Sequence, residues 1–359
     1  MSARAWLKGI HAIAPDHMVR IMNVCGGHER VISEAGLRSV LPKNITLIPG
    51  PGCPVCVCPE EDIFAAIQLA LKEDVAVAAF GDMLRAPVNV SPKEARSLEE
   101  ARARGGTILP MASPTEAARW AEAHPQRQLV FLAAGFETTT APVAAMLAQN
   151  PPDNLSVLLA ARLTWPAVAG LLASGEAHFD GLVAPGHVAT VMGPEEWAFI
   201  PRDHGLPVAV AGFTPESMLA ALHSLLKQIR EGTVLVDNCY PASVHPGGNP
   251  GARSLLNDIM TVVDAPWRGL GIIPQSGFQL RPPWDRYDAR KRFGIQPDAD
   301  RKRAGAMPPG CDCAQVVMGR IPPNLCRLYG KPCTPRTPIG PCMVSDEGAC
   351  RIWWSHGSR

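Results

Sequence analysis

The chain has 359 residues, 47% of them hydrophobic, which is enough for two or three α/β domains with cores of their own. A formal net charge of +1, with no basic run longer than three residues, gives no sign of a nucleic-acid or membrane-surface partner. The most apolar long stretch, residues 156–174, is interrupted by Arg162 and Pro166 and is not expected to cross a membrane. The N-terminal residues lack the apolar segment of a secretory signal, so we expect a cytoplasmic protein.

The 11 cysteines are distributed unevenly along the chain. Four lie in the first 58 residues, six lie between positions 311 and 350, and Cys239 stands alone between the two groups. In a reducing cytoplasm such cysteines favour metal ligation or redox chemistry over a disulfide framework. We therefore expect two separate sulfur sites.

Short apolar segments recur through the first two thirds of the chain, and each ends in glycine or a polar cluster. Helix-compatible stretches such as residues 60–74 and 113–125 lie between them. This alternation is typical of parallel sheets covered on both faces, where ligands bind outside the carboxyl ends of the strands. The segments that begin with an expected strand are residues 19–29, 45–53, 75–83, 129–140, 155–162, 179–187, 206–216 and 233–240.

Two blocks, residues 21–112 and 113–238, each hold about four of these strands and are interpreted as two lobes around a cleft. The alternation fades after residues 241–252. From Pro282 onward proline, arginine and cysteine dominate. Residues 239–359 are therefore expected to form a third, loop-rich domain whose order depends on a bound metal.

The segment "NVCGGHE" places Cys25 after a strand and His28 three residues further on. A thiol at a helix N-terminus beside an imidazole should have a lowered pKa and be available as thiolate. The alternative is a buried cysteine in a turn whose histidine bonds to the backbone.

The segment "IPGPGCPVCVCPE", residues 48–60, contains Cys53, Cys56 and Cys58. Its Cys-x-x-Cys spacing suits a dithiol/disulfide couple or half of a tetrahedral metal site. The chain has no second Cys-x-x-Cys, which makes half of a zinc site the weaker interpretation.

Glu137, in "GFETTTAP", follows a strand and precedes a helix, so it would face a ligand only if the lobes form a cleft.

The strongest compositional signal comes from the six tail cysteines. Six cysteines in so short a cytoplasmic segment argue for an iron–sulfur cluster or zinc, and four ligands would leave two thiols over. Spacing alone does not say which two of Cys311, Cys313, Cys326, Cys333, Cys342 and Cys350 these are.

Taken together, the motifs resemble those of the hydrogenase maturation factor HypD family. The resemblance extends over nearly the whole chain, and the co-occurrence of its cysteine motifs is highly specific. The matching segments are "CGGHE", "GPGCPVC", "FGDMLR", "GFETTTAP", "PGHV", "WRGLGIIPQSG" and "CTPRTPIGPCMVSDEGAC".

The resemblance implies two related α/β domains plus a cluster domain built from the tail, with residues 1–20 packed on it. The family's [4Fe-4S] cluster resembles that of ferredoxin:thioredoxin reductase. By this resemblance Cys313 and Cys342 become a redox pair beside the cluster, although an exchange of Cys311 with Cys313 stays open. The ligands would be Cys311, Cys326, Cys333 and Cys350.

The resemblance also implies a scaffold on which the Fe(CN)2CO unit of [NiFe]-hydrogenases is assembled. HypC would share the iron, HypE would donate cyanide from a thiocyanate, and the hydrogenase large subunit would receive the product through HypC. Cys25 would bind that iron, and Cys53 and Cys56 match the family's essential thiol pair. His28 and Glu137 would line the same cleft.

Two thiols have no counterpart in this pattern. Cys58 is expected to be dispensable, and Cys239 is interpreted as a buried structural cysteine. The competing function is a cluster-dependent disulfide reductase of a partner protein, which would not need Cys25, His28, Cys53 and Cys56. A Rossmann-like nucleotide enzyme is disfavoured because the chain lacks both glycine-rich phosphate-binding motifs.

Overall fold

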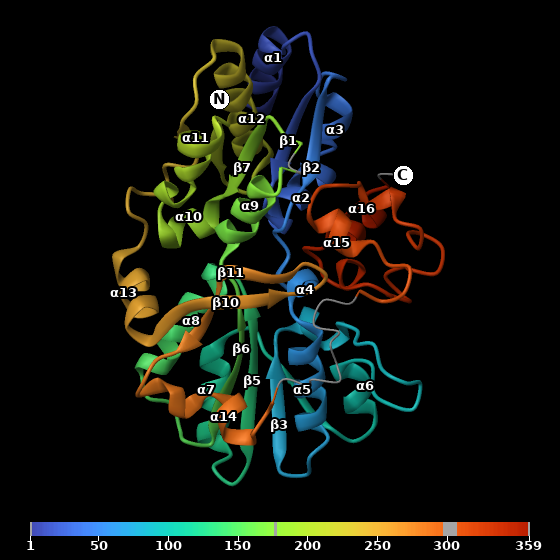
Figure 1. The fold of residues 1–359 in the computed structure, drawn as a ribbon, viewed down its shortest axis with the longest axis vertical. Helices are drawn as coiled ribbons and strands as arrows, with labels where there is room; N and C mark the ends of the chain where they lie inside the picture. The colour runs from blue at the N-terminus through green and yellow to red at the C-terminus, as the bar shows by residue number, and fades with distance from the viewer. Residues whose placement is uncertain (1, 176–177, 297–306, 358–359) are drawn as a thin grey trace.

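The computed structural model describes residues 2–175, 178–296 and 307–357. Two parallel sheets lie one above the other along the long axis of the molecule (Figure 1). Residues 297–306 and 358–359 of the expected tail domain lie outside the described residues. None of the described helices is long and apolar enough to span a bilayer.

The upper sheet has five strands, all paired in parallel. In spatial order they are β2 (Ile45–Pro49), β1 (Val19–Asn23), β7 (Gly181–Pro185), β8 (Val208–Ala211) and β9 (Val236–Asn238). Its helices are α1 (Ala3–Ile13), α2 (Gly26–Glu34), α3 (Leu37–Val40), α9 (Thr164–Ala173), α10 (Gly186–Met192), α11 (Phe199–His204) and α12 (Pro215–Glu231), with the short 3-10 helix η2 (Pro194–Trp197).

The lower sheet has four parallel strands. In spatial order they are β4 (Thr107–Pro110), β3 (Val75–Ala79), β5 (Gln128–Gly135) and β6 (Leu155–Ala161). Its helices are α5 (Glu60–Ala70), α6 (Leu98–Ala103), α7 (Pro114–Ala123), α8 (Glu137–Ala148) and α14 (Ala289–Phe293), with the 3-10 helices η1 (Gly81–Arg85) and η3 (Trp284–Tyr287).

Burial explains why the strands are apolar along their whole length. All residues of β3, β6 and β7 are buried, as helices on both faces of a parallel sheet require. Helices such as α12 are instead buried on one face only. In α12 the buried residues recur on one face, Thr214 caps the first turn, and Gly232 ends the helix with φ of 67°.

The strand pairing corrects the expected lobe boundaries. Residues 21–112 give β1 and β2 to the upper sheet but β3 and β4 to the lower one. Residues 113–238 are divided in the same way, since β5 and β6 are in the lower sheet and β7, β8 and β9 are in the upper. The chain therefore passes from the upper sheet to the lower one after β2 and returns after β6.

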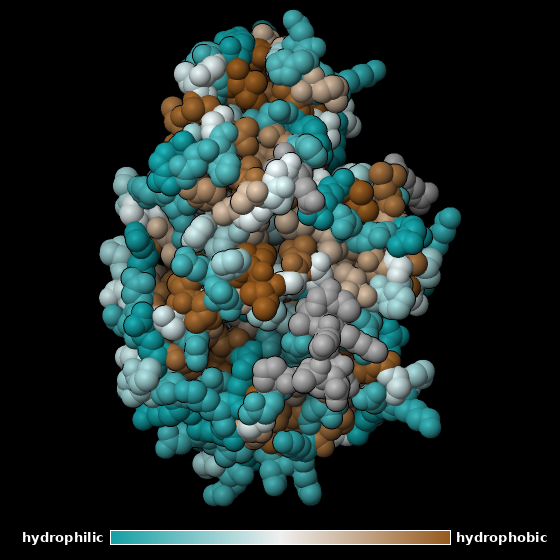
Figure 2. Space-filling view, in the orientation of Figure 1, coloured by the Kyte–Doolittle hydropathy of each residue, from teal (hydrophilic) through white to brown (hydrophobic). Residues whose placement is uncertain are grey.

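A two-stranded hairpin crosses the molecule between the two sheets (Figure 1). It consists of β10 (Met260–Trp267) and β11 (Gly271–Leu280), follows α13 (Pro250–Ile259), and pairs antiparallel with a bulge after Val263. It carries the exposed residues Val262 and Ile272, and Figure 2 shows apolar atoms gathered in the middle of this face. The hairpin is not part of the cysteine-rich tail, which corrects the expected start of that domain at residue 239.

The cysteine-rich tail is a compact loop region beside α4 (Pro54–Val57) (Figure 1). Its short helices are η4 (Pro323–Leu325), η5 (Pro341–Met343), α15 (Cys313–Val317) and α16 (Ala349–Ser355). Among the described residues before β1, the N-terminal helix was expected to pack on this tail and packs elsewhere. The N-terminal helix α1 lies against α12, where the rings of Trp6 and His223 are 5.2 Å apart, because both helices bury apolar faces in the upper core.

Candidate functional site

Cys25 lies where β1 ends and α2 begins. Its φ and ψ of −152° and 128° are extended, so it immediately precedes the first helical residue. Its sulfur accepts no capping hydrogen bond from the described residues, but the backbone N–H groups of Gly27 and His28 are near enough to favour its thiolate form, as expected at a helix N-terminus. The side chain is half-buried.

Glycines allow three segments to meet around Cys25. A Cβ added to Gly26 would lie 2.4 Å from the Cβ of Glu347 in the tail, and one added to Gly52 would lie 2.3 Å from the backbone nitrogen of Cys25. The N–H of Gly26 also donates to the carbonyl of Gly52 at 3.1 Å. The first sulfur loop, the second sulfur loop and the tail can approach this closely only because these positions lack side chains.

The thiol of Cys25 is not activated as the sequence predicted. Burial, and next the nearby carboxylate of Glu347, raise the pKa of Cys25 to about 12, although the helix N-terminal N–H groups oppose this. A free thiol in this place is therefore protonated at neutral pH. A thiolate would have to be stabilised by something positive, such as a bound metal ion.

His28 is fully buried. Its Nε2–H donates to the carbonyl of Ala211 at 3.0 Å, and its ring lies 4.9 Å from that of Phe213. Burial lowers the pKa of His28 to about 4, so the imidazole is neutral. Its Nδ1 has no hydrogen-bond partner in the described part of the chain.

Cys53 and Cys56 form a disulfide in the structure. Cys53 caps α4, where its sulfur accepts the N–H of Cys56 at 3.2 Å, and Pro54 occupies the first helical position. Both cysteines are buried. The interpretation of the Cys-x-x-Cys segment as a dithiol/disulfide couple agrees with this geometry.

The first sulfur loops and the tail line one small cavity. Its lining includes Cys25, Cys53, Cys56, Glu347 and Cys342. The sequence placed Cys342 in a separate site, and the structure brings it to the same cavity as the thiols of the first sixty residues. The two sulfur sites are thus neighbours.

The six tail cysteines surround a second small cavity. All of them line it, together with Tyr329, Gly340 and Met343, and five of the six are buried. Cys342 lines both cavities, so it connects the two sites. The six are Cys311, Cys313, Cys326, Cys333, Cys342 and Cys350.

Several of these thiols are in direct contact. Cys313 is hydrogen-bonded to Cys311 and to Cys342, and Cys342 is also hydrogen-bonded to Cys350. Burial opposes ionisation of Cys313, but the two hydrogen bonds lower its pKa to about 6, and donating to Cys313 raises the pKa of Cys342. The pair that the family resemblance singles out, Cys313 and Cys342, is thus a contacting pair.

Among the described residues, no group of three or more His, Cys, Asp or Glu side chains is positioned so that it could hold a single metal ion. The donor set nevertheless fits an iron–sulfur cluster in its chemistry, since such clusters take thiolate ligands and buried surroundings. Gly340 provides room at this cavity, because a Cβ there would lie 2.4 Å from the sulfur of Cys311.

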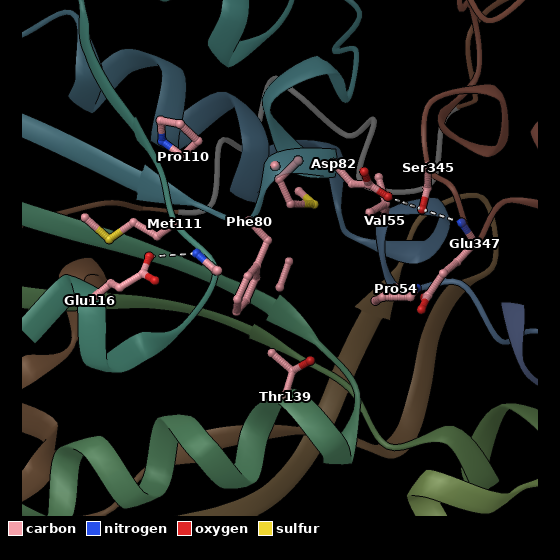
Figure 3. Close-up of a pocket in the computed structure, with 14 residues that line it drawn as sticks. Pro54, Val55, Phe80, Asp82, Pro110, Met111, Glu116, Thr139, Ser345 and Glu347 are labelled. Carbon is pink, nitrogen blue, oxygen red and sulfur yellow. Dashed lines mark hydrogen bonds between the residues drawn. The ribbon is translucent and has the colours of Figure 1, made fainter. Parts of the chain in front are cut away.

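A larger cavity of about 620 Å³ opens over the carboxyl ends of β3 and β4 (Figure 3). Pro54 and Val55 of the disulfide loop line it, as do Asp82 and Glu347. Asp82 accepts hydrogen bonds from the hydroxyl of Ser345 at 2.8 Å and from the backbone of the next residue, which fixes the tail over this cavity. The cavity therefore reaches from the lower sheet to the residues around Cys25.

Comparison with known proteins agrees with this arrangement of motifs. The model of the family described as "HypD: Hydrogenase formation hypA family" matches residues 1–357. The chain belongs to the HypD family. It is 40% identical to the hydrogenase maturation factor HypD2 of Bradyrhizobium diazoefficiens over 98% of this chain and 93% of the relative. It is 39% identical to the hydrogenase maturation factor HypD of Azotobacter vinelandii, over 96% and 90% of the two chains.

The HypD-family motif "GFETTTAP" has a buried carboxylate in this chain. Glu137 is not among the residues that line the cavity at Cys25. It accepts hydrogen bonds from the backbone N–H and the hydroxyl of Thr164, at 2.6 and 2.7 Å. Burial raises the pKa of Glu137. Burial, and next the nearby Glu137, raise the pKa of Glu196 to about 9.

Sequence reasoning missed Glu347, the tail carboxylate beside Cys25. The signal was present in the quoted tail motif, where it is one of two acidic residues among cysteines. Of the two unassigned thiols, Cys58 is buried. Burial, and next the nearby carboxylate of Asp62, raise the pKa of its thiol. Cys239 is half-buried, with its sulfur 3.6 Å from the carboxylate of Asp237.

Proposed function

We propose that this chain is the scaffold on which the Fe(CN)2CO unit is assembled during [NiFe]-hydrogenase maturation, with Cys25 holding the iron. Its membership of a family of hydrogenase maturation factors supports the process. One observation carries the specific role: Cys25, the Cys53–Cys56 disulfide and Cys342 line the same cavity. A thiolate is a suitable anchor for iron(II) that carries cyanide and carbonyl ligands, because such iron is soft.

The tail would hold a [4Fe-4S] cluster through Cys311, Cys326, Cys333 and Cys350. Such a cluster, when bound, supplies electrons one at a time. Cys313 and Cys342 would then be the redox pair, which is supported by their mutual hydrogen bond and by the place of Cys342 in both cavities. A disulfide is reduced to two thiols by two electrons, so this pair can couple the one-electron steps of the cluster to a two-electron reaction.

Cys53 and Cys56 would carry out the reductive step on the cyanide donor. Their dithiol form and a partner's thiocyanate, R–S–CN, give the disulfide, R–SH and HCN. The S–CN bond breaks, the S–S bond forms, and two electrons pass from the dithiol to the thiocyanate. The disulfide of the structure corresponds to the oxidised product of this step, and returning it to the dithiol takes two electrons and two protons.

HypC would share the iron at Cys25, and HypE would be the cyanide donor. The cavity that reaches from Asp82 to Glu347 beside the disulfide loop provides a route from the surface for a thiocyanate-bearing chain end (Figure 3). The finished unit would pass through HypC to the hydrogenase large subunit.

Infrared spectroscopy of the anaerobically purified complex with HypC tests this function. Cyanide and carbonyl stretching bands are expected from the complex. An active complex without them would instead point to a disulfide reductase. That alternative is not favoured, because a disulfide reductase would not need Cys25 and because the relatives are named hydrogenase maturation factors.

A further inference from the structure

Arg268 lies at the turn of the β10–β11 hairpin, where the hairpin meets both sulfur segments. Its backbone N–H donates to the carbonyl of Val57, next to the disulfide loop, at 2.9 Å. The following residue, Gly269, has φ of +77°, and a Cβ there would lie 2.8 Å from the Cβ of Ala314, the neighbour of Cys313. In Figure 1 the hairpin extends to α4, beside the tail. The turn is therefore inserted between the disulfide loop and the tail.

The guanidinium of Arg268 is buried without a hydrogen-bond partner. The residue is 1% exposed, and its Nε, Nη1 and Nη2 have no hydrogen bond to any described residue. A guanidinium remains charged inside proteins, so an uncompensated one is costly and calls for a negative partner. The acidic residue that acts on it is Glu60, but the oxygens of Glu60 already accept the backbone N–H and side-chain amide of Asn89.

The other buried arginine among the described residues has hydrogen-bond partners for its guanidinium, so the case of Arg268 is specific. Arg162 is 5% exposed, and its three guanidinium nitrogens donate to the carbonyls of Ala161 and Pro266. The other groups that interact electrostatically with the guanidinium of Arg268 and favour its charged form are three thiols, Cys313, Cys58 and Cys311. Two of these three belong to the tail cavity.

We propose that Arg268 supplies the positive charge that balances the sulfur centre of the tail and sets its reduction potential. This inference rests on the proposed function, because it takes the tail to hold a cluster. The donor set and the arginine fit each other: a cluster with thiolate ligands is an anion, and buried N–H donors next to sulfur are one of the ways in which proteins tune cluster potentials. Arg268 is a positioning residue in this scheme and binds no iron.

The sign of the effect follows from the charge. Each added electron makes the centre more negative, and a fixed cation beside it stabilises the reduced form more than the oxidised one. Arg268 therefore raises the reduction potential. Removing its charge should shift the potential to more negative values, which would slow the return of electrons to Cys313 and Cys342.

The test is a potentiometric titration, followed by electron paramagnetic resonance, of the full-length protein purified anaerobically. Arg268→Gln should shift the one-electron equilibrium at least tenfold, or about 59 mV, to the negative side. Arg268→Lys, which keeps the charge, should shift it less. Arg281→Gln is the matched control, because Arg281 is an exposed arginine at the other end of the same hairpin, and it should leave the potential unchanged.

Iron and sulfide content, measured on the same samples, separates the outcomes. A wild-type chain without a cluster would contradict the proposed function itself. A full cluster with wild-type potential in Arg268→Gln would overturn the role of Arg268 alone. If Arg268→Gln loses the cluster, recovery of cluster content in Arg268→Lys supports a charge role, and loss in both variants overturns it.

Discussion

The thiol of Cys313 is hydrogen-bonded to that of Cys342, which comes from a different turn of the tail. Cys342 also lines the cavity of Cys25 and the Cys53–Cys56 disulfide. A contacting pair of thiols that reaches both cavities suits electron transfer between them better than it suits cluster ligation. This relationship divides the tail cysteines into two groups that can be tested separately.

Replacing Cys326, Cys333 or Cys350 by alanine should lower the iron and sulfide content per chain and make the tail sensitive to protease, because ligation orders a loop-rich segment. Cys313→Ala and Cys342→Ala should keep the cluster and the protease resistance but stop hydrogenase maturation.

The measurement covers all six tail cysteines one at a time, with chemical analysis and limited proteolysis. Cys311→Ala should have an intermediate effect, because Cys313 is hydrogen-bonded to Cys311 and lies at the same cavity. Cluster loss in Cys313→Ala or Cys342→Ala as complete as in Cys326→Ala would show that the four-plus-two division is wrong.

Glu347→Gln should lower the pKa of the Cys25 thiol in the iron-free protein. The carboxylate contributes to raising that pKa to about 12, and the amide removes the charge while keeping the shape. Burial, the larger cause, is unchanged, so the pKa should remain above the ordinary value for cysteine. The check is the rate of alkylation of Cys25 against pH, followed by mass spectrometry. Asp346→Asn serves as control, because the carboxylate of Asp346 pairs with Arg351 and does not contribute to the pKa shift of Cys25, and identical profiles for Glu347→Gln and wild type would refute the effect.

Cys53→Ser should abolish hydrogenase maturation and leave the fold and the tail cluster intact, because the disulfide closes only a short loop. Cys58→Ser is its matched control from the same loop. Cys58 is buried but forms no disulfide, so its variant should mature hydrogenase nearly as well as wild type. Equal loss of activity in the two variants would argue that the loop's packing matters, not its redox chemistry.

Glu29→Ala should destabilise the docking of the tail. The buried Glu29 pairs with Arg38 at 2.9 Å and accepts the indole N–H of Trp353, from α16, at 2.6 Å. Removing one member of a buried pair costs about 3 kcal/mol of unfolding free energy. The exposed Glu34→Ala on the same helix should cost less than about 1 kcal/mol, although Glu34 pairs with Arg30 and lies 3.7 Å from His356 of the tail, because exposed pairs contribute little. Urea unfolding of both variants compares them, and equal stability would contradict the docking role.

Much of the fold could be predicted from local sequence, because buried parallel strands are continuous apolar runs. Each of the eight segments expected to begin with a strand does contain one. The strand β4 was missed, since it is short and only one of its four residues is buried. The hairpin was missed because Asp264, Pro266 and Pro274 interrupt its alternation.

Strand pairing could not be predicted in the same way. Parallel strands are joined by long crossovers, so nothing local says that β1 pairs with β7 of a distant segment. The site could likewise be predicted only in part. The motifs identified the thiols, but the direction of the pKa shift of Cys25 depends on its burial and on Glu347, which comes from the other end of the chain.

Cys25→Ala, purified anaerobically in complex with HypC, separates the two proposed iron sites in one sample. Infrared spectroscopy reports the cyanide and carbonyl ligands of the assembled iron, and visible absorbance reports the tail cluster. The cyanide and carbonyl bands should disappear while the brown absorbance of the cluster persists at wild-type intensity. Bands of undiminished strength, or loss of the brown absorbance, would contradict the assignment of Cys25 as the anchor of a separate iron.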